Sequence, residues 1–590
     1  MTTPDRTRAV RIANCSGFYG DRIGAARDMV EGGPIDVLTG DYLAELTMLI
    51  LAKAQQKDPA AGYAKTFLTQ IEQVLGSCVD RGIKVVANAG GLNPAGLAGA
   101  VRNVATRLGL DVRVAHVEGD DLRGKLSAIT PAVTDKPVSA NAYLGGWGIA
   151  AALDAGADVV VTGRVTDASL VVGPAAWWHG WRNDAWDPLA GAVVAGHVIE
   201  CGPQATGGNY PFAEELPDLS YPGFPIAEVG ADGSATITKH PGTGGLVSVG
   251  TVTAQLLYEI GPPGYLGPDV TAHFDTITLT QAGADRVAIS GTCGSPPPPT
   301  LKVALNDAGG FRNTMTMVLT GLDIEAKAAR AQAMLFDVLG GRDRFTEVDV
   351  RLLRFDTPDA PTNEQATAHL RITVKDPDPA KVGRRFSNAV MELALAGYAG
   401  FHTTTPPTSE SAYGVYRPAS VPRGAVEHAV VLPDGVRRKV PDPPTAPAVV
   451  VDPLPATHPD APSGPTRPVP LGRVCGARSG DKGGDANIGL WARDDRGYAW
   501  LSEYLTVERL RELLGPEVAD LKIDRFELPN LRAINVVVHG LLGDGVASCT
   551  RPDPQAKGLG EYLRSRVVDI PEALLGFPPP RPTVAAMGKC

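Results

Sequence analysis

The first third of the chain alternates short apolar runs with longer segments of helical periodicity. Four β-branched runs predict strands: AVRIAN, KVVANAG, VRVAHV and DVVVTG. Ala- and Leu-rich segments between them predict helices at 41–56, 62–80, 94–108 and 146–155. Such an alternation is typical of βαβ units, so we expect residues 1–215 to form an α/β region around a mainly parallel sheet.

The pattern changes further along the chain. Residues 216–445 contain alternating strand patterns (SATITKH, DTITLTQ, RVAISGT, EVDVRLLRF and AHLRITVKD) and helical patterns near 322–339 and 379–399. They predict an α+β region of the same large domain, with a mostly antiparallel sheet. Residues 446–470 are rich in Pro and Ala, which is typical of an extended linker.

A separate small domain is expected over residues 471–575. Its apolar patterns predict strands at VCGAR, ANIGLWAR and LRAINVVVHG and helices at TVERLRELL and GLGEYLRSRVV. This order favours a ferredoxin-like α+β sandwich.

Composition excludes several classes of protein. The 590 residues carry a net charge of only -10 and no basic block, so a nucleic-acid partner is not expected. Seven scattered cysteines without CxxC pairs argue against a zinc site and a disulfide framework, which favours reduced thiols in the cytoplasm. No apolar run reaches the ~20 residues needed to cross a bilayer. We expect an acidic enzyme with a small-molecule substrate, no bound metal or cofactor, and a homo-oligomeric state.

Turns after the predicted strands supply the first candidate binding residues, because ligands bind at the carboxyl ends of such strands. Arg164 and Asp167 follow the fourth strand, where Arg164 could clamp a carboxylate and Asp167 could move a proton. Asp41 and Glu45 are interpreted only as helix caps. The other candidates for substrate binding are Asn14, Asp21 and Arg22 after the first strand and Asn88, Gly90, Gly91 and Asn93 after the second.

The segment HVIECGPQATGGNY concentrates catalytic residue types. His197 or Glu200 is a candidate general base and Cys201 a candidate nucleophile, while Gln204 and Asn209 could bind substrate. His197 and Cys201 are four residues apart, so they share a face in either a strand or a helix and are expected to meet. Four prolines at 296–299 predict a rigid wall that positions Thr300 and Lys302.

The most charged motif is SGDKGGDANIG in the small domain. The segment from Arg478 to Asn487 is expected to be a functional loop, too long for a simple hairpin turn. Its glycine spacing does not match a Walker loop. The candidates here are Lys482, Asp481 and Asp485 for catalysis and Arg478, Ser479 and Asn487 for substrate binding.

Taken with GFYGDR, NAGGLNP, VTGRVTDASL and ECGPQATGGNY, this motif resembles the acyclic terpene utilisation AtuA family along nearly the whole chain. Family motifs usually read SGDKGD, so Gly484 is an expected insertion. The resemblance implies a large N-terminal domain, a ferredoxin-like C-terminal domain, and a place in citronellol and geraniol catabolism, which proceeds through acyl-CoA thioesters.

From the residues we expect hydration, dehydration or C–C lyase chemistry on a branched acyl-CoA or related acid. The alternatives are a Cys201-dependent acyl transferase or hydrolase, and a non-catalytic partner of an acyl-CoA enzyme.

Overall fold

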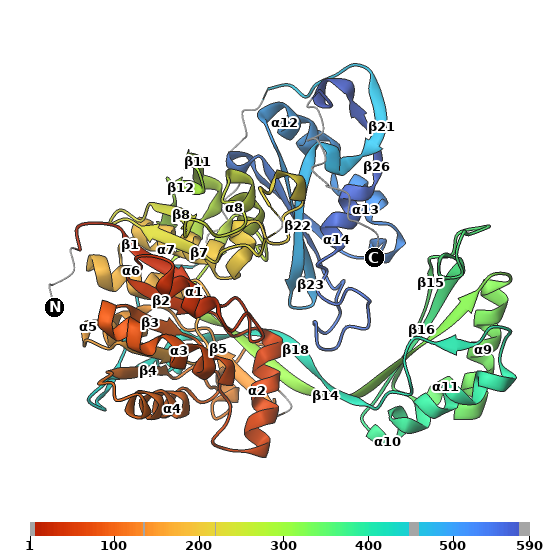
Figure 1. Cartoon of the computed structure of the whole chain (residues 1–590), viewed down its shortest axis with the longest axis horizontal. Coiled ribbons are helices and arrows are strands. Elements are labelled where there is room, and N and C mark those ends of the chain that lie inside the picture. Colours follow the sequence, from red (N-terminus) through yellow and green to blue (C-terminus); the bar gives the residue numbers. More distant parts are fainter. Residues whose placement is uncertain (1–5, 134–135, 219, 448–458, 577–590) are drawn as a thin grey trace. The chain divides into compact units, whose positions relative to one another are not determined.

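The computed structural model describes residues 6–133, 136–218, 220–447 and 459–576 (Figure 1). These divide into two compact units. The larger comprises residues 1–306, 416–546 and 555–590, and the smaller comprises residues 307–415 and 547–554. The larger unit therefore holds both the N-terminal α/β region and the C-terminal domain.

A mixed sheet forms the centre of the larger unit, with strand order β11-β12-β8-β7-β1-β2-β3-β6-β4-β19-β20. Its middle pairs are parallel: β1 (Val10–Asn14), β2 (Val37–Gly40), β3 (Lys84–Ala87), β6 (Val159–Thr162) and β4 (Val114–Glu118). Antiparallel strands extend both sides: β7 (Pro225–Val229), β8 (Ala235–Lys239), β12 (Arg286–Ser290), β11 (Thr278–Gly283), β19 (Ala429–Val431) and β20 (Arg437–Lys439).

Helices cover both faces of the parallel part, as its near-continuous apolar strands require. Within β6, Val160 belongs to one hydrophobic core and Val159 and Val161 to the other, because successive side chains point to opposite faces. The α-helices between residues 6 and 260 are α1 (Ala25–Glu31), α2 (Glu45–Lys57), α3 (Lys65–Arg81), α4 (Pro94–Arg107), α5 (Trp147–Asp154), α6 (Ser169–His179), α7 (Trp186–Ile199) and α8 (Val249–Leu256). The expected α/β class is confirmed, while β2, α1, α6, α7 and α8 were not predicted.

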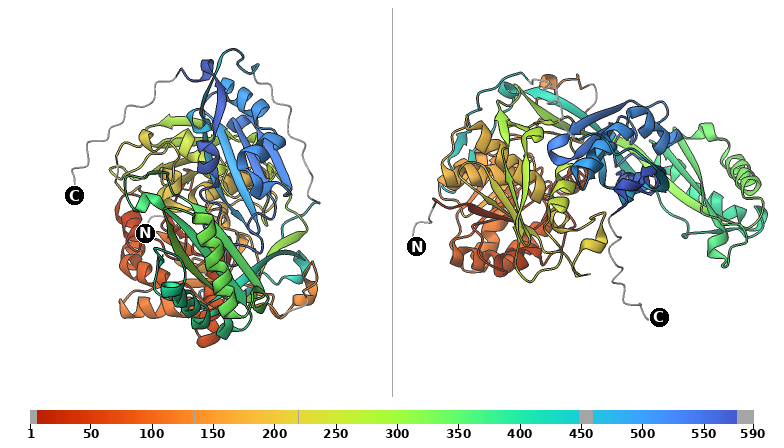
Figure 2. Two further views of the ribbon diagram at one scale, coloured as in Figure 1. Left: turned by 90° about the vertical axis from the view of Figure 1, so that its right-hand side faces the viewer. Right: turned by 90° about the horizontal axis from the view of Figure 1, so that it is seen from above.

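The smaller unit is built on β15 (Glu347–Arg354), β16 (Thr367–Asp376), β14 (Thr300–Thr320) and β17 (His402–Thr403). Helices α9 (Ile324–Leu339), α10 (Pro379–Val382) and α11 (Arg384–Ala396) belong to it, and α9 and α11 share its apolar core with the strands (Figure 2). Strand β14 is long enough to serve both units, since its first part pairs with β5 (Ser139–Ala142) and its later part with β16. Strand β18 (Ser411–Pro422) also pairs with β14.

The C-terminal domain has the strand order β22-β23-β25-β24, with bounds Cys475–Lys482, Asp485–Ala492, Ala533–Val538 and Ile523–Leu528. Helices α12 (Asp495–Tyr504), α13 (Val507–Leu514) and α14 (Leu559–Ser565) complete the ferredoxin-like fold. Strand β21 (Thr466–Pro470) pairs with β26 (Val567–Pro571), so the domain begins within the stretch expected to be linker. Residues 448–458 of that linker lie outside the described residues.

A further small sheet of the larger unit joins β13 (Cys293–Ser295), β10 (Thr271–His273) and β9 (Gly264–Leu266). It lies next in sequence to the turn at residues 258–263 and to the four prolines at 296–299, both of which approach the cavity described below.

Candidate functional site

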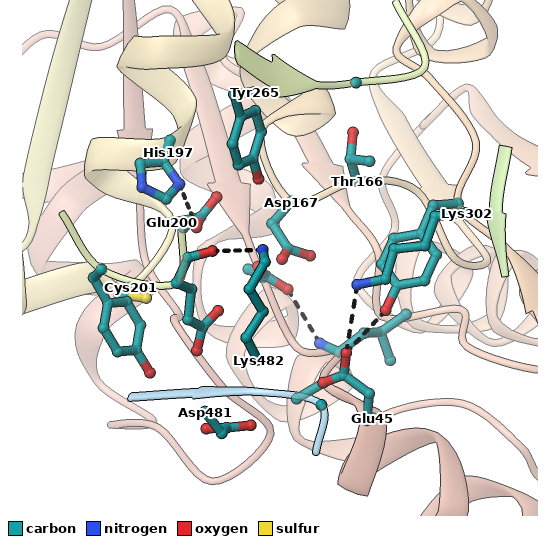
Figure 3. Close-up of a pocket in the computed structure, with 18 of the residues that line it drawn as sticks. Glu45, Thr166, Asp167, His197, Glu200, Cys201, Tyr265, Lys302, Asp481 and Lys482 are labelled. Carbon is teal, nitrogen blue, oxygen red and sulfur yellow. Dashed lines mark hydrogen bonds and ion pairs between the residues drawn. The ribbon is translucent and has the colours of Figure 1, made fainter. Parts of the chain in front are cut away.

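A cavity of about 1080 Å³ lies within the larger unit, between the turns of the α/β region and the first strand of the C-terminal domain. Figure 3 shows acidic, basic and aromatic side chains converging on it from these separate segments. Its chemically active lining comprises Asp21, Asp41, Glu45, Tyr143, Arg164, Asp167, His197, Glu200, Cys201, Gln204, Asn209, Tyr258, Glu259, Tyr265, Lys302, Asp481, Lys482 and Lys557.

The end of α7 places Glu200 in the cavity. The helix ends at Ile199, and the Asn14 side-chain amide at the end of β1 donates hydrogen bonds to the carbonyls of Ile199 (2.7 Å) and Glu200 (3.1 Å). Asn14, predicted to bind substrate, therefore positions the catalytic candidate instead. The turn after β1 also packs closely against the backbone of Cys201. Only a glycine fits at position 17, since a Cβ there would lie 2.7 Å from the Cys201 carbonyl carbon.

His197 meets Glu200 and not Cys201. Its Nδ1 lies 3.2 Å from Glu200 Oε1 (Figure 3). The expected pairing of His197 with Cys201 is not seen, because α7 ends before Cys201 and the chain turns into a 3-10 segment at Gly202–Thr206. The i, i+3 spacing on the last helical turn brings His197 to Glu200 instead.

Both members of this pair are held in their neutral forms. Burial raises the pKa of Glu200 well above its ordinary value, and the charges of Asp167 and Glu259 raise it further. Burial lowers the pKa of His197 to about 4. Within the described residues, Glu200 Oε2 and both His197 ring nitrogens lack a hydrogen-bond partner. Glu200 is thus a protonated acid with one oxygen available to a ligand.

Arg164 is used structurally. It is 4% exposed, donates to the Leu43 carbonyl (2.8 Å), pairs with Asp167 (3.0 Å) and stacks on the Tyr143 ring at 4.3 Å. These contacts orient Asp167 toward the cavity. They leave the guanidinium less able to clamp a substrate carboxylate than the sequence suggested.

Lys302 and Glu45 form a second charged group. Lys302 Nζ lies 3.9 Å from Glu45 Oε1, which accepts a hydrogen bond from Tyr143 Oη at 3.1 Å. Pro298, Pro299 and Thr300 line the cavity beside Lys302, as the rigid-wall interpretation expects.

The interpretation of Asp41 and Glu45 as mere helix caps was wrong. Helix α2 has Ala44 at its N-cap position, without a side-chain cap. Asp41 is buried and accepts a hydrogen bond from Asn88 (2.6 Å), and burial together with the Asp167 charge raises its pKa. The missed strand β2 is the reason: it puts these acids at a strand end, where the sheet rule would have indicated them.

The charged motif of the C-terminal domain is a tight hairpin and not a long loop. β22 and β23 pair as far as Lys482 and Asp485, joined by Gly483 and Gly484 alone. Gly483 adopts a φ of +67°, which glycine tolerates and which suits a two-residue turn. The expectation of a long loop was wrong because both strands continue through polar residues, whereas the prediction ended each strand where its apolar residues end.

Alternation along β22 gives the hairpin residues different tasks. Arg478, Gly480 and Lys482 face the turn at Tyr258 and Glu259: Arg478 stacks on the Tyr258 ring at 4.6 Å, and Lys482 Nζ donates to the Glu259 carbonyl at 3.0 Å. On the other face, the Ser479 hydroxyl accepts from the Gly560 amide. Gly480 is needed because a Cβ would collide with the Tyr258 ring.

Two buried asparagines fix the Glu259 turn against this sheet. Asn487 Oδ1 accepts from the Glu259 amide (2.7 Å), and Asn535 Nδ2 donates to the Ile260 (3.1 Å) and Gly261 (2.7 Å) carbonyls. Glu259 has a φ of +58°, an unfavourable backbone conformation for a residue with a side chain. Asn487 therefore holds the site together, and Glu259 is a cavity residue that the sequence did not indicate.

Asp481 and Lys482 both titrate near neutrality. Burial, followed by the charge of Glu259, raises the pKa of Asp481 to about 7. Desolvation by the cavity walls, followed by the charge of Lys302, lowers the pKa of Lys482 to about 8. The C-terminal domain thus contributes an acid and an amine that can both exchange protons at neutral pH.

Cys201 lines the cavity as a thiol. Burial raises its pKa well above the ordinary value. Gln204 accepts a hydrogen bond from Arg478, and Asn209 also lines the cavity.

Except for Asp21, the remaining sequence candidates lie outside the lining. Asp485 accepts from His539 (3.0 Å) and the Gly540 amide (2.8 Å). Arg22 pairs with Asp28, while its neighbour Asp21 accepts from the Gly17 amide (2.8 Å) at the cavity edge. Asn93 caps α4 by accepting from Gly96 (2.9 Å). Asn88, Gly90 and Gly91 are packed in the interior, and their contact with substrate stays a prediction.

The described part of the chain contains no group of three or more His, Cys, Asp or Glu residues arranged to hold a metal ion. None of the helices described is long and apolar enough to cross a membrane. Cys15, Cys78, Cys201, Cys293, Cys475 and Cys549 are free thiols, and Cys590 lies outside the described residues.

Comparison with known proteins agrees with this architecture. The profile described as acyclic terpene utilisation family protein AtuA matches residues 10–432, and that of the AtuA ferredoxin-like domain matches residues 469–569. A search of the curated proteins gave no match. The first profile alone covers well over half of the chain, and the chain belongs to the acyclic terpene utilisation AtuA family.

Proposed function

We propose that this chain is an enzyme that adds water to, or removes it from, a branched acyl-CoA thioester or a related carboxylic acid by acid–base catalysis. The observation that carries the proposal is the buried Glu200 carboxyl, whose Oε2 lacks a hydrogen-bond partner among the described residues, in a cavity that also holds Lys302 and Lys482. Burial raises the pKa of this carboxyl and so favours its protonated form. Membership of a family named for acyclic terpene utilisation is consistent with branched acids as substrates.

The geometry supports separate roles for the lysine ammonium groups and the carboxyl groups. When water adds to the double bond of an unsaturated thioester, negative charge develops on the thioester oxygen, and a lysine ammonium stabilises it. The protonated Glu200 then donates its proton to the carbon beside the thioester. Asp167, held by Arg164, or Asp481 accepts the proton of the attacking water. Dehydration follows the same steps in reverse.

Cavity size supports a large substrate. Small-molecule sites usually enclose ~300–1,000 Å³. The cavity here, about 1080 Å³, has room for a branched acyl chain together with part of a pantetheine arm.

The Cys201 alternative receives less support. Thiolate is the nucleophilic form of cysteine, and burial beside Glu200 raises the pKa of the Cys201 thiol and so disfavours it.

Turnover by the purified protein tests the proposal. Branched acyl-CoA thioesters, including 3-hydroxy-3-methylglutaryl-CoA, are incubated with the full chain, and the products are identified by mass spectrometry. We expect gain or loss of water, and a fall in turnover of about 10²–10⁴-fold in Glu200→Gln, which loses the proton donor.

Glu214→Gln, at an exposed glutamate outside the cavity lining, is the matched control and should keep full turnover. No change in any thioester would overturn the proposal. Retained turnover in Glu200→Gln together with lost turnover in Cys201→Ser would favour the cysteine alternative.

A further inference from the structure

Lys482 is unusual among the cations of the cavity. Its Nζ donates to the Glu259 backbone carbonyl at 3.0 Å, and no carboxylate of the described residues lies within ion-pair distance of it. By contrast, Arg164 pairs with Asp167, and Lys302 with Glu45. In Figure 3 the Lys482 side chain extends from the hairpin toward Asp167 and Glu200. A lysine kept only to balance charge would be expected to lie against a carboxylate.

We propose that Lys482 Nζ forms an imine with a ketone or aldehyde carbonyl of the substrate. The inference rests on the proposed function in one respect, that this cavity is the active site. It adds that the substrate carries an oxo group as well as its acid or thioester group.

The surroundings of Lys482 favour the free amine, which is the nucleophile. A second cation, Lys302, lines the same cavity, and desolvation together with its charge lowers the pKa of Lys482 to about 8. A substantial fraction of the side chain is therefore unprotonated at slightly alkaline pH. Lys482 remains exposed to the cavity, so a substrate carbonyl can reach it, and a lysine whose pKa is lowered by another cation is a recognised arrangement for imine-forming catalysts.

Rigid support keeps the amine in place. Lys482 is the last residue of β22 before the two-residue turn, and the neighbouring strand β23 holds the Glu259 turn through Asn487. The Glu259 carbonyl thus fixes Nζ from one side while the cavity remains open on the other.

The chemistry balances with groups in the cavity. The neutral amine attacks the carbonyl carbon, forming a C–N bond and a carbinolamine. The protonated Glu200 gives its proton to the departing hydroxyl, water leaves, and a protonated imine remains. Where the substrate has a hydroxyl two carbons from the imine carbon, a carboxylate such as Asp481 or Asp167 removes its proton. The bond between the hydroxyl-bearing carbon and the carbon adjacent to the imine carbon then breaks. The hydroxyl-bearing carbon leaves as a carbonyl product, and the electron pair of the broken bond forms the enamine. The same carboxyl group returns its proton to the enamine carbon, which gives the product imine. Water hydrolyses the product imine and restores Lys482 and Glu200.

Reduction with borohydride tests the imine directly. The full-length protein is incubated with acetoacetate, reduced with sodium borohydride and digested with trypsin. Trypsin does not cleave after a modified lysine, so labelling at Lys482 joins residues 479–482 to 483–493 in one peptide carrying the reduced adduct. We expect this peptide, and at least a tenfold loss of total label (about 1.4 kcal/mol) in Lys482→Arg, which keeps the charge but cannot form an imine.

Lys522→Arg is the matched control: Lys522 lies in the same domain but outside the cavity lining and pairs with Asp524 (2.9 Å), so the adduct should remain on Lys482. Mapping the adduct in the wild-type protein gives the result even if Lys482→Arg fails to fold. Label absent from Lys482, or spread equally over surface lysines, overturns the inference. Thioester turnover without any borohydride-dependent label at Lys482 would refute the imine alone, whereas absence of turnover together with a clear Lys482 adduct would refute only the hydration proposal.

Discussion

At the scale of single residues, the side chains that line the cavity were more predictable than the way they pair with one another. Residue type and position after strands were enough to single out Asp167, His197, Glu200 and Lys482, all of which line the cavity. Their pairing was not predictable. His197 contacts Glu200, and not Cys201, because α7 ends at Ile199. The end of a helix depends on tertiary contacts, here the hydrogen bonds from Asn14 to the Ile199 and Glu200 carbonyls.

The buried Glu200 should cost stability in a pH-dependent way. Its pKa in the folded chain lies above the ordinary value of 4.5, so its contribution is fully present below pH 4.5 and is lost as the pH rises toward the folded pKa. Glu200→Gln cannot ionise and so avoids this loss of stability. The melting temperature of Glu200→Gln minus that of the wild-type protein should therefore increase from pH 4 to pH 8. Each unit of pKa difference is worth about 1.4 kcal/mol. Thermal unfolding of both proteins across this range measures the effect, with Glu214→Gln as control, and a difference that shrinks with pH would contradict it.

At the scale of elements, the hairpin of β22 and β23 was not predicted, because the ends of its strands are polar. Gly-Gly between two strands is a hairpin signal, yet the charges on either side suggested a loop. The strand ends are polar because they face a cavity, and local periodicity does not reveal which face of a strand lines one. The Glu259 turn was missed for a similar reason, since its partners Asn487 and Asn535 are distant in sequence.

The hairpin turn should tolerate no side chain at Gly484, because a Cβ there would collide with the Gly543 carbonyl oxygen. Gly484→Ala is expected to lower the free energy of unfolding by ~1–3 kcal/mol and to displace Lys482, with loss of the borohydride-trapped adduct. Gly76→Ala is the matched control, because Gly76 lies inside α3 with no atom within 4 Å of a Cβ, and it should stabilise the chain by ~0.5–1 kcal/mol. Urea unfolding of both variants makes the comparison. Unchanged stability and labelling in Gly484→Ala would show that the turn does not position the lysine.

At the scale of the whole molecule, the fold class of each region was predictable, whereas the boundaries and contacts between regions were not. The α/β region and the ferredoxin-like domain followed from periodicity and element order. The separate unit at 307–415 did not, because β14 runs without interruption through its boundary and no composition change marks it. Contacts between the α/β region and the C-terminal domain depend on side-chain hydrogen bonds to backbone groups, such as Asn530 to the Phe274 and Ile277 carbonyls, which leave no periodic pattern in the sequence. The homo-oligomeric state stays a prediction.

The central claim is that two parts of the chain, far apart in sequence, form one substrate site. Hydrogen exchange of the full-length protein, with and without 3-hydroxy-3-methylglutaryl-CoA, tests it most directly. Backbone amides at 197–204, 258–261 and 478–484 line or support the same cavity, so bound ligand should slow exchange in all three segments together. Protection confined to the α/β region, with the 478–484 segment unchanged, would contradict the account.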